Sequence, residues 1–241
     1  ESTPKESSMS AKLKIMMMVA LMGSSAFAVA SGNASKHNAS GSKPSGKYTI
    51  TCNEYLVLKE TDKPVIIGYE ISKRLETSEK IIKTPLGEHP SKVLKNQPVL
   101  ATILRAGLAM HNGLLNYFDK ADNAYLSAYR KHHPDGSFDI CLEYISCPDL
   151  KDRVVIISDP MLATGSSLVK SIQHLKEIGN FKQIHIVCAI ACKAGIDHVL
   201  NQIPDAIIWC GDIDNELTSK GYIVPGLGDA GDLAYGTKIQ Q

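Results

Sequence analysis

The strongest constraint on the fold is an alternation of apolar, strand-like runs with amphipathic, helix-like segments. Six runs rich in β-branched and aromatic residues are predicted as strands: 99–104, 124–130, 138–146, 154–158, 184–190 and 206–210. Between two of them, residues 166–179 repeat apolar side chains at helical spacing from Leu168 through Ile172 and Leu175 to Ile178, before a glycine stop signal. This alternation predicts an α/β fold, with a mostly parallel sheet flanked by helices.

Charge and cysteine content exclude several classes of function. The 241 residues include 26 Lys+Arg against 25 Asp+Glu, so no charge excess would attract a nucleic-acid polymer or an anionic membrane. Any anion site must therefore be local. The six cysteines form no CxxC pair and no zinc-ligand spacing, and several lie within apolar runs. They are interpreted as reduced core residues, which predicts a reducing, cytoplasmic location.

The first 47 residues differ from the rest of the chain. Residues 31–47 are rich in Ser, Gly, Asn and Lys and are predicted to be a flexible segment. The apolar run IMMMVALM before them, with small-residue cleavage motifs at Ala28 and Ala30, is typical of a secretory signal but too short to span a bilayer. A disordered or signal-like extension over 1–47 and one domain over 48–241 are therefore expected.

The stretch VVIISDPMLATGSSLVKSI, which begins at Val154, joins a strand to a helix through an aspartate and small residues. Pro160 cannot donate a ladder hydrogen bond, so the strand is predicted to end with the Asp159 carboxylate at the carboxyl edge of the sheet. Small residues let a ligand approach the main chain, and the amides that open a helix suit a phosphate dianion. An ordinary turn with serine as the helix cap is the simpler alternative.

Four motifs together resemble one family. DPMLATGSS at Asp159 resembles the phosphoribosyl-pyrophosphate (PRPP) loop of phosphoribosyltransferases, in the form that marks the uracil phosphoribosyltransferases. TPLGEH at Thr84, ILRAGLAM at Ile103 and GYIVPGLGDAGDLAYGTK at Gly221 are similar to further segments of that family, in the same order. The resemblance implies a phosphoribosyltransferase-like sheet with a C-terminal base-binding hood. It also implies a pyrimidine-salvage reaction, in which PRPP and uracil give UMP and pyrophosphate.

The resemblance also implies which residues form the site. The implied PRPP-binding residues are Arg105, Arg130, Asp159, Pro160, Met161, Leu162, Ala163, Thr164, Gly165, Ser166, Ser167 and Asp229. The implied uracil-binding residues are Ile223, Gly228, Asp229 and Ala230. Arg105, Asp159 and Asp229 are the implied catalytic residues, with Mg²⁺ as the cofactor, held with PRPP near Asp229. The implied partners are uracil, PRPP and further copies of the chain in a homo-oligomer.

Two departures from the family pattern keep other functions open. Ser166 replaces the family's second glycine, which costs roughly 1 kcal/mol if the position needs a positive φ. Lys131 follows Arg130, where the family has an acidic residue, so the loop 131–137 is basic. The alternatives are a non-catalytic PRPP-binding or nucleotide-binding regulatory homologue, a transferase for another base, and an exported protein with a vestigial site.

Overall fold

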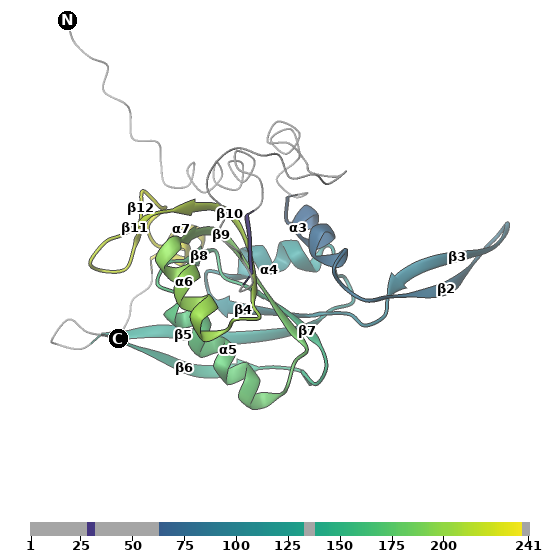
Figure 1. Cartoon of the computed structure of the whole chain (residues 1–241), viewed down its shortest axis with the longest axis horizontal. Coiled ribbons are helices and arrows are strands. Elements are labelled where there is room, and N and C mark those ends of the chain that lie inside the picture. The colour runs from purple at the N-terminus through teal and green to yellow at the C-terminus, as the bar shows by residue number, and fades with distance from the viewer. Residues whose placement is uncertain (1–27, 32–62, 133–137, 238–241) are drawn as a thin grey trace, which may run out of the picture.

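The computed structural model describes residues 28–31, 63–132 and 138–237, and the side chains of 28–31, 63–66, 129–132 and 138–142 lie outside this description. A single large sheet forms the centre of the molecule, with the strand order β1-β10-β9-β7-β4-β5-β6 and with β8 paired to β9 (Figure 1). Its strands are β1 (Ala28–Ser31), β4 (Val99–Leu104), β5 (Asp122–His132), β6 (Phe138–Ser146), β7 (Val154–Ser158), β8 (Met161–Leu162), β9 (Gln183–Cys192) and β10 (Ile207–Asp214).

The α/β prediction is confirmed. The five central strands are mutually parallel, and only the edge strands β1 and β6 run antiparallel to their neighbours. Three predicted strands have the predicted bounds, namely β4, β6 and β7. The other three differ by between one and four residues at an end, because apolar composition marks the buried part of a strand and not where its hydrogen-bonded ladder stops.

Helices cover both faces of the sheet. The helices are α3 (Lys63–Ser72), α4 (Leu108–Leu115), α5 (Ser166–Ile178), α6 (Lys193–Gln202) and α7 (Ala230–Tyr235). On one face α5 and α6 bury Leu168, Ile172 and Val199 in the larger core cluster. On the other face Ile71 of α3 and Leu114 of α4 belong to a second cluster. The sheet is therefore buried on both sides, as its near-continuous apolar strands require.

The predicted apolar face of α5 is correct except at its end. Leu168, Ile172 and Leu175 are at most 1% exposed, which agrees with the helical spacing of the sequence. Ile178, the last residue of the helix, is 47% exposed. Periodicity places a side chain on a face, but it does not show how far along the helix that face stays covered.

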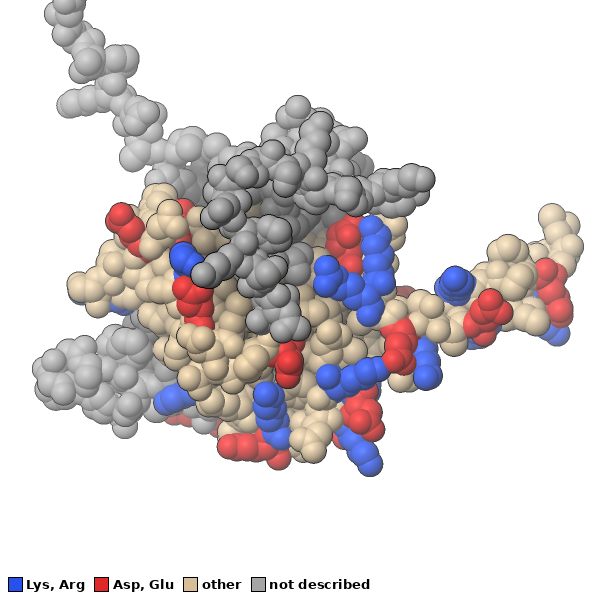
Figure 2. Space-filling view, viewed as in Figure 1, with Lys and Arg blue, Asp and Glu red and all other residues tan. Residues whose placement is uncertain are grey.

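A hairpin outside the sheet has no counterpart in the sequence prediction. Strands β2 (Thr77–Thr84) and β3 (Gly87–Leu94) pair over eight residues and project from the domain as a narrow arm (Figure 1). All eight residues of β2 are exposed. In Figure 2, positively charged Lys and negatively charged Glu side chains lie along the arm. Such strands lack the alternation of apolar and polar residues that marks a half-buried strand.

Residues within the predicted extension contribute one strand. β1 lies in the first 47 residues and pairs with β10, with Ala28 opposite Cys210 and Ser31 opposite Ile207. The rest of the extension lies outside the described residues, so its predicted flexibility stays a prediction. Among the described residues no helix has both the length and the apolar character to cross a membrane.

Candidate active site

The order of the strands marks where a ligand would bind. From β4 the chain adds β5 on one side of the sheet and then returns to add β7 on the other side of β4. In open α/β sheets, the crevice beyond the carboxyl ends of strands at such a reversal is the usual ligand site. Arg105 follows β4 and Asp159 follows β7, so the structure brings these two predicted residues together at the reversal.

The loop after β7 is fixed to the neighbouring strand β9 through its main chain. As predicted, β7 ends at Ser158, directly before Asp159 and Pro160. The Asp159 N–H still donates to the Val187 carbonyl at 3.0 Å, and the Pro160 carbonyl accepts from Ala189 N at 3.0 Å. The next two residues of the loop form the short strand β8, also against β9. The half-buried Asp159 side chain accepts a long contact from Met161 N, at 3.5 Å.

The loop ends in a helix whose N-cap residue forms no side-chain cap, while Thr164 Oγ1, just before it, accepts from Ser166 N at 3.4 Å. Gly165 is the N-cap of α5 with φ +78°, and no side-chain cap hydrogen bond is formed there. The simpler reading of this turn, with serine as the cap, is therefore wrong. Helix geometry leaves the first amides of α5 without partners inside the helix. Together with the helix dipole they form a site suited to a phosphate group.

The serine at position 166, where the family has glycine, does not have the positive φ that would make this substitution costly. Among the described residues Asp152 is the one non-glycine residue with a positive φ, so Ser166 has none. The left-handed conformation falls on Gly165, which the chain retains, and Ser166 is the first residue of α5. The Ser166 hydroxyl instead lies 3.2 Å from Thr164 Oγ1.

Several predicted PRPP-binding residues contribute only main chain or packing. Leu162 is fully buried in the larger core cluster, and Ala163 is 8% exposed. Pro160 is buried as well and has no N–H to donate. A Cβ on Gly195 of α6 would meet the Ala163 carbonyl, so α6 lies directly against the loop. The loop is therefore anchored to the core through its apolar side chains.

Buried hydroxyl groups join the turn after β4 to the end of β7. Ser158 Oγ, fully buried, lies 3.3 Å from both the Ala101 and the Gly107 carbonyls, which share its single proton. Thr102 Oγ1 donates to the Ser158 carbonyl at 3.5 Å. A Cβ on Gly107 would collide with that hydroxyl and that carbonyl. The hydrogen bonds of Thr102 and Ser158, two residues that the motifs did not identify, fix the Arg105 turn relative to Asp159.

The Arg105 side chain contacts the C-terminal helix. Its Nη2 donates to Asp232 Oδ1 at 2.9 Å, and its Nη1 donates to the Gly236 carbonyl at 3.3 Å. The turn after β4 is thus in direct contact with the C-terminal segment 216–237, which is called the hood below. Asp232 is another residue that the motif assignment missed, although it stands three residues after Asp229 in the same motif.

The hood packs on the loop 159–167 through an apolar cluster. The short strands β11 (Glu216–Leu217) and β12 (Ile223–Val224) pair with each other. Ile223 is 2% exposed and lies in one cluster with Ala163 and Ile190. Its side chain is therefore committed to packing, which leaves its main chain for a ligand. Asp214 Oδ2 accepts from Gly226 N at 3.0 Å and fixes the turn that follows.

The remaining predicted uracil residues surround the start of α7. Gly228 has φ +81° and open space around it, Asp229 is the N-cap, and Ala230 is the first helical residue. Asp229 Oδ1 accepts from Asp232 N at 2.9 Å. A Cβ on Gly231 would lie 3.7 Å from Ala106 Cβ, so this helix start touches the turn that carries Arg105.

Two parts of the prediction fall outside the description. Arg130 lies within β5, where its backbone pairs with Ile140, but its side chain is not among the described ones. Within the basic loop 131–137, residues 133–137 are outside the described residues altogether. Their predicted contribution to the diphosphate site stays a prediction.

A buried histidine lies in α4, the helix that follows the Arg105 turn, and its surroundings favour the neutral form. His111 of α4 is fully buried, with its ring 5.3 Å from the Tyr125 ring between centroids. Burial is the main cause that lowers the pKa of His111 below its ordinary value. His111 therefore adds no cation to the anion site.

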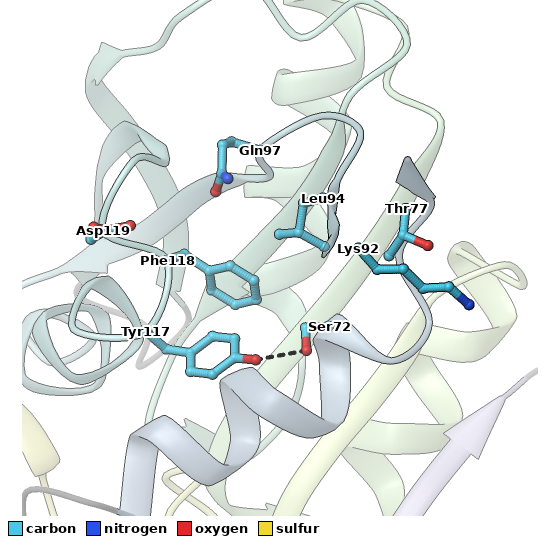
Figure 3. Close-up of a pocket in the computed structure, with 8 residues that line it drawn as sticks. All are labelled: Ser72, Thr77, Lys92, Leu94, Gln97, Tyr117, Phe118 and Asp119. Carbon is cyan, nitrogen blue, oxygen red and sulfur yellow. Dashed lines mark hydrogen bonds between the residues drawn. The ribbon is translucent and has the colours of Figure 1, made fainter. Parts of the chain in front are cut away.

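A cavity of the domain lies away from this edge of the sheet. Its volume is about 280 Å³, and Leu94, Gln97, Tyr117 and Phe118 line it at the base of the hairpin (Figure 3). Gln97 precedes β4, so the cavity lies at the amino edge, opposite Arg105 and Asp159.

Comparisons with known proteins agree with this geometry. The family model for uracil phosphoribosyltransferase matches residues 62–237. Uracil phosphoribosyltransferases of Porphyromonas gingivalis and Rhizobium meliloti are 51% and 40% identical, over 72% and 80% of this chain and 81% and 90% of theirs. The solved structure of the AQ2163 protein from Aquifex aeolicus is 30% identical, with a TM-score of 0.68 over 78% of this chain and 88% of that one. Fold, site and matched sequence place the protein among the phosphoribosyltransferases. The chain belongs to the uracil phosphoribosyltransferase family.

Proposed function

We propose that the protein transfers the phosphoribosyl group of PRPP to uracil and forms UMP and pyrophosphate. One observation carries the proposal. The loop 159–165, which leads into the N-terminus of α5 and suits a 5-phosphate, packs against the hood that bears the uracil motif through the cluster of Ala163 and Ile223. A phosphate site and a base site in direct contact fit a substrate pair that must react with each other.

The residues at this edge supply positioning and electrostatic stabilisation. The amides and hydroxyls of 163–167 hold the 5-phosphate, and Asp159 accepts from the ribose hydroxyls. Arg105 neutralises negative charge that moves onto the diphosphate as uracil N1 replaces it at the anomeric carbon. No strong general base is assigned, because preorganised charge and alignment are the main catalytic effects in this proposal.

Mg²⁺ is proposed as a companion of PRPP and not as an ion held by a protein-built site. Among the described residues no group of three His, Cys, Asp or Glu side chains could hold a metal. Asp229 Oδ1 already accepts from the Asp232 amide, so this carboxylate fits one contact to a metal–diphosphate complex better than a full ligand shell. When bound with PRPP, Mg²⁺ supplies charge neutralisation of the leaving diphosphate.

The direct test of the proposed function is a UMP-formation assay with the full chain. Uracil and PRPP should yield UMP and pyrophosphate in equal amounts. PRPP binding without UMP formation would favour the non-catalytic regulatory alternative. No described feature of the site favours that alternative, since the Ser166 substitution leaves the loop backbone unstrained.

The base is proposed to be read by main-chain groups of the hood. Because Ile223 is buried and Gly228 has no side chain, backbone N–H and carbonyl groups remain as the partners for uracil O4 and N3–H. Cytosine reverses both partners, which leaves buried polar groups unpaired. Sites of this kind discriminate by roughly 10⁴-fold. We expect 5-fluorouracil to be a substrate and cytosine to be none, and comparable kcat/KM values for cytosine and uracil would disprove this reading.

The hairpin supports the proposed homo-oligomer. Ile81, Ile82 and Leu86 are 62%, 42% and 99% exposed on the arm. An isolated two-stranded hairpin is marginally stable in water, so a second copy of the chain that covers these side chains would account for the arm. Sedimentation of the wild type and of an Ile81→Ser, Leu86→Ser variant tests the proposal. A smaller species is expected for the variant, and an unchanged mass would exclude the arm as the contact.

The compartment and the domain boundary also remain proposals. The four cysteines whose side chains are described, Cys147, Cys188, Cys192 and Cys210, are free thiols, which supports the proposal of a reducing, cytoplasmic compartment. Deletion of residues 1–47 should retain UMP formation, although it removes β1 and exposes the edge of β10. Loss of activity or solubility would show that the domain begins earlier than residue 48.

A further inference from the structure

One arginine holds both ends of the C-terminal helix. Arg105 donates to the Asp232 carboxylate in the first turn of α7 and to the carbonyl of Gly236, the C-cap of the same helix. The Arg105 and Asp232 side chains are 39% and 31% exposed, so the ion pair is partly shielded from water. An ion pair that is partly shielded from water and has a short nitrogen–oxygen distance holds its two side chains more firmly than a fully exposed pair does.

The same helix carries predicted substrate contacts. Asp229 caps α7 and accepts from the Asp232 amide at 2.9 Å, so the two carboxylates occupy one helical turn. Gly231 lies against Ala106, the residue after Arg105. Any shift of α7 relative to the Arg105 turn therefore moves the predicted base-binding residues relative to the predicted diphosphate-binding residue.

The guanidinium group retains donors beyond these two contacts. Arginine has five N–H donors in a planar fork, and the hydrogen bonds to Asp232 and Gly236 use two of them. An arginine that is already held along part of its fork loses less side-chain freedom when its other donors bind a substrate. A carboxylate in this place can thus favour diphosphate binding without touching the diphosphate.

We propose that Asp232 is a positioning residue, which orients Arg105 for the diphosphate of PRPP and couples the diphosphate site to the base site. The inference rests on the proposed function. It gives a role to a residue that the sequence motifs left without one. By linkage, PRPP bound at Arg105 strengthens uracil binding at the hood, and uracil strengthens PRPP binding by the same factor.

The experiment compares Asp232→Ala and Asp232→Asn with the wild-type chain. PRPP binding is measured by calorimetry without uracil, and steady-state assays give KM for PRPP, KM for uracil and kcat. We expect Asp232→Ala to raise the Kd and KM for PRPP by roughly 3- to 10-fold, with kcat within about twofold of wild type. Asp232→Asn, which keeps an acceptor oxygen, should lie between the two.

A second ion pair supplies a matched control. Arg153 donates to Asp122 at 2.9 Å, the same distance as in the Arg105 pair, but Asp122 opens β5 at the amino edge of the sheet. Asp122→Ala should therefore leave PRPP binding and both KM values unchanged. Urea unfolding of all variants shows whether a variant has lost its fold, in which case the milder Asp232→Asn decides.

The outcomes separate the inference from the function on which it rests. If the wild type neither binds PRPP nor forms UMP, the proposed function is wrong. If the wild type is active and Asp232→Ala has unchanged PRPP affinity, the positioning role is wrong. Tighter PRPP binding by Asp232→Ala would also overturn it, because the carboxylate would then compete with the diphosphate for Arg105.

Discussion

The turn after β4 and the hairpin just before it are held in opposite ways. At the turn, a Cβ on Gly107 has no room, and the buried hydroxyls of Thr102 and Ser158 join it to the next strand. In the hairpin, all of β2 is exposed and its eight register pairs all lie within the arm. The site is thus set by the packing of distant segments, whereas the arm beyond its base, where Leu94 packs against the core, is held mainly by its own ladder. This difference can be tested at both places.

The largest expected effect comes from the buried strands beside the site. Ile157→Ala, at a fully buried position of β7, should lower the free energy of unfolding by roughly 2–5 kcal/mol, because it removes packed methyl groups and leaves a cavity. Leu86→Ala, at the 99% exposed tip of the arm, should change it by less than about 0.5 kcal/mol in the monomer. Urea unfolding measures both. A loss for Leu86→Ala that grows with protein concentration would show that the arm is covered in an oligomer.

The next effect is a pH dependence that arises from the face of the sheet near α3. His185 is fully buried, its Nδ1 accepts from Trp209 Nε1 at 2.9 Å, and burial together with Arg74 lowers its pKa from 6.5 to about 4. The unfolded chain binds this proton more readily, so stability is complete above pH 6.5 and falls as pH drops from about 6.5 to about 4. The maximum loss from this group is about 3 kcal/mol.

Substitution of His185 checks this assignment. His185→Gln keeps an acceptor for the indole N–H but removes the titration, so unfolding midpoints measured between pH 7 and pH 4 should fall less steeply than in wild type. His89→Gln on the exposed arm should keep the wild-type profile. The buried His111 has its pKa lowered in the same direction, so some slope should remain in the His185 variant. Identical profiles for all three proteins would contradict the assignment.

A smaller effect is expected when a charge of the site is removed. Arg105→Ala and Asp159→Asn should each lower kcat/KM roughly 10- to 150-fold, because charge-assisted contacts to PRPP are lost. This corresponds to a loss of about 1.5–3 kcal/mol of transition-state stabilisation. Neither side chain lies in the core, so thermal unfolding should stay close to wild type. Lys83→Ala, which breaks the exposed pair with Glu88 on the arm, is the control. Wild-type kinetics for either site variant would remove that residue from the site.

The smallest effect concerns the hydroxyl that joins the two loops of the site. Ser158→Ala should cost about 1 kcal/mol of stability and raise KM for PRPP a few-fold, because the Gly107 carbonyl loses its buried donor. Ser78→Ala, at an exposed position of β2, should change neither quantity. If both serines behave alike, the buried hydroxyl does not set the position of the Arg105 turn.

Parts of the fold with strong local signals were predictable from the sequence. Apolar runs gave β4 and β7 their predicted bounds, the alternation in 138–146 gave those of β6, and helical spacing placed Leu168, Ile172 and Leu175 in the core. The arm was missed, since β2 is exposed along its whole length and shows no alternation. At the site, the motifs led to the loop 159–167 and to α7. They did not reveal Ser158, Thr102 or Asp232, whose hydrogen bonds join segments between 51 and 127 residues apart.

The sequence by itself determined the alternation of strands and helices, the end of β7 at an aspartate before proline, and the family to which the chain belongs. Those features depend on side-chain periodicity, on the missing N–H of Pro160 and on contiguous motifs, all of which are local. Only the tertiary structure decided that the left-handed residue is Gly165 and not position 166, that Ile223 is committed to packing, and that Arg105 holds α7 through Asp232. Each of these depends on which distant segments share a sheet edge, and close packing between such segments sets backbone angles and charge pairs that local sequence does not encode.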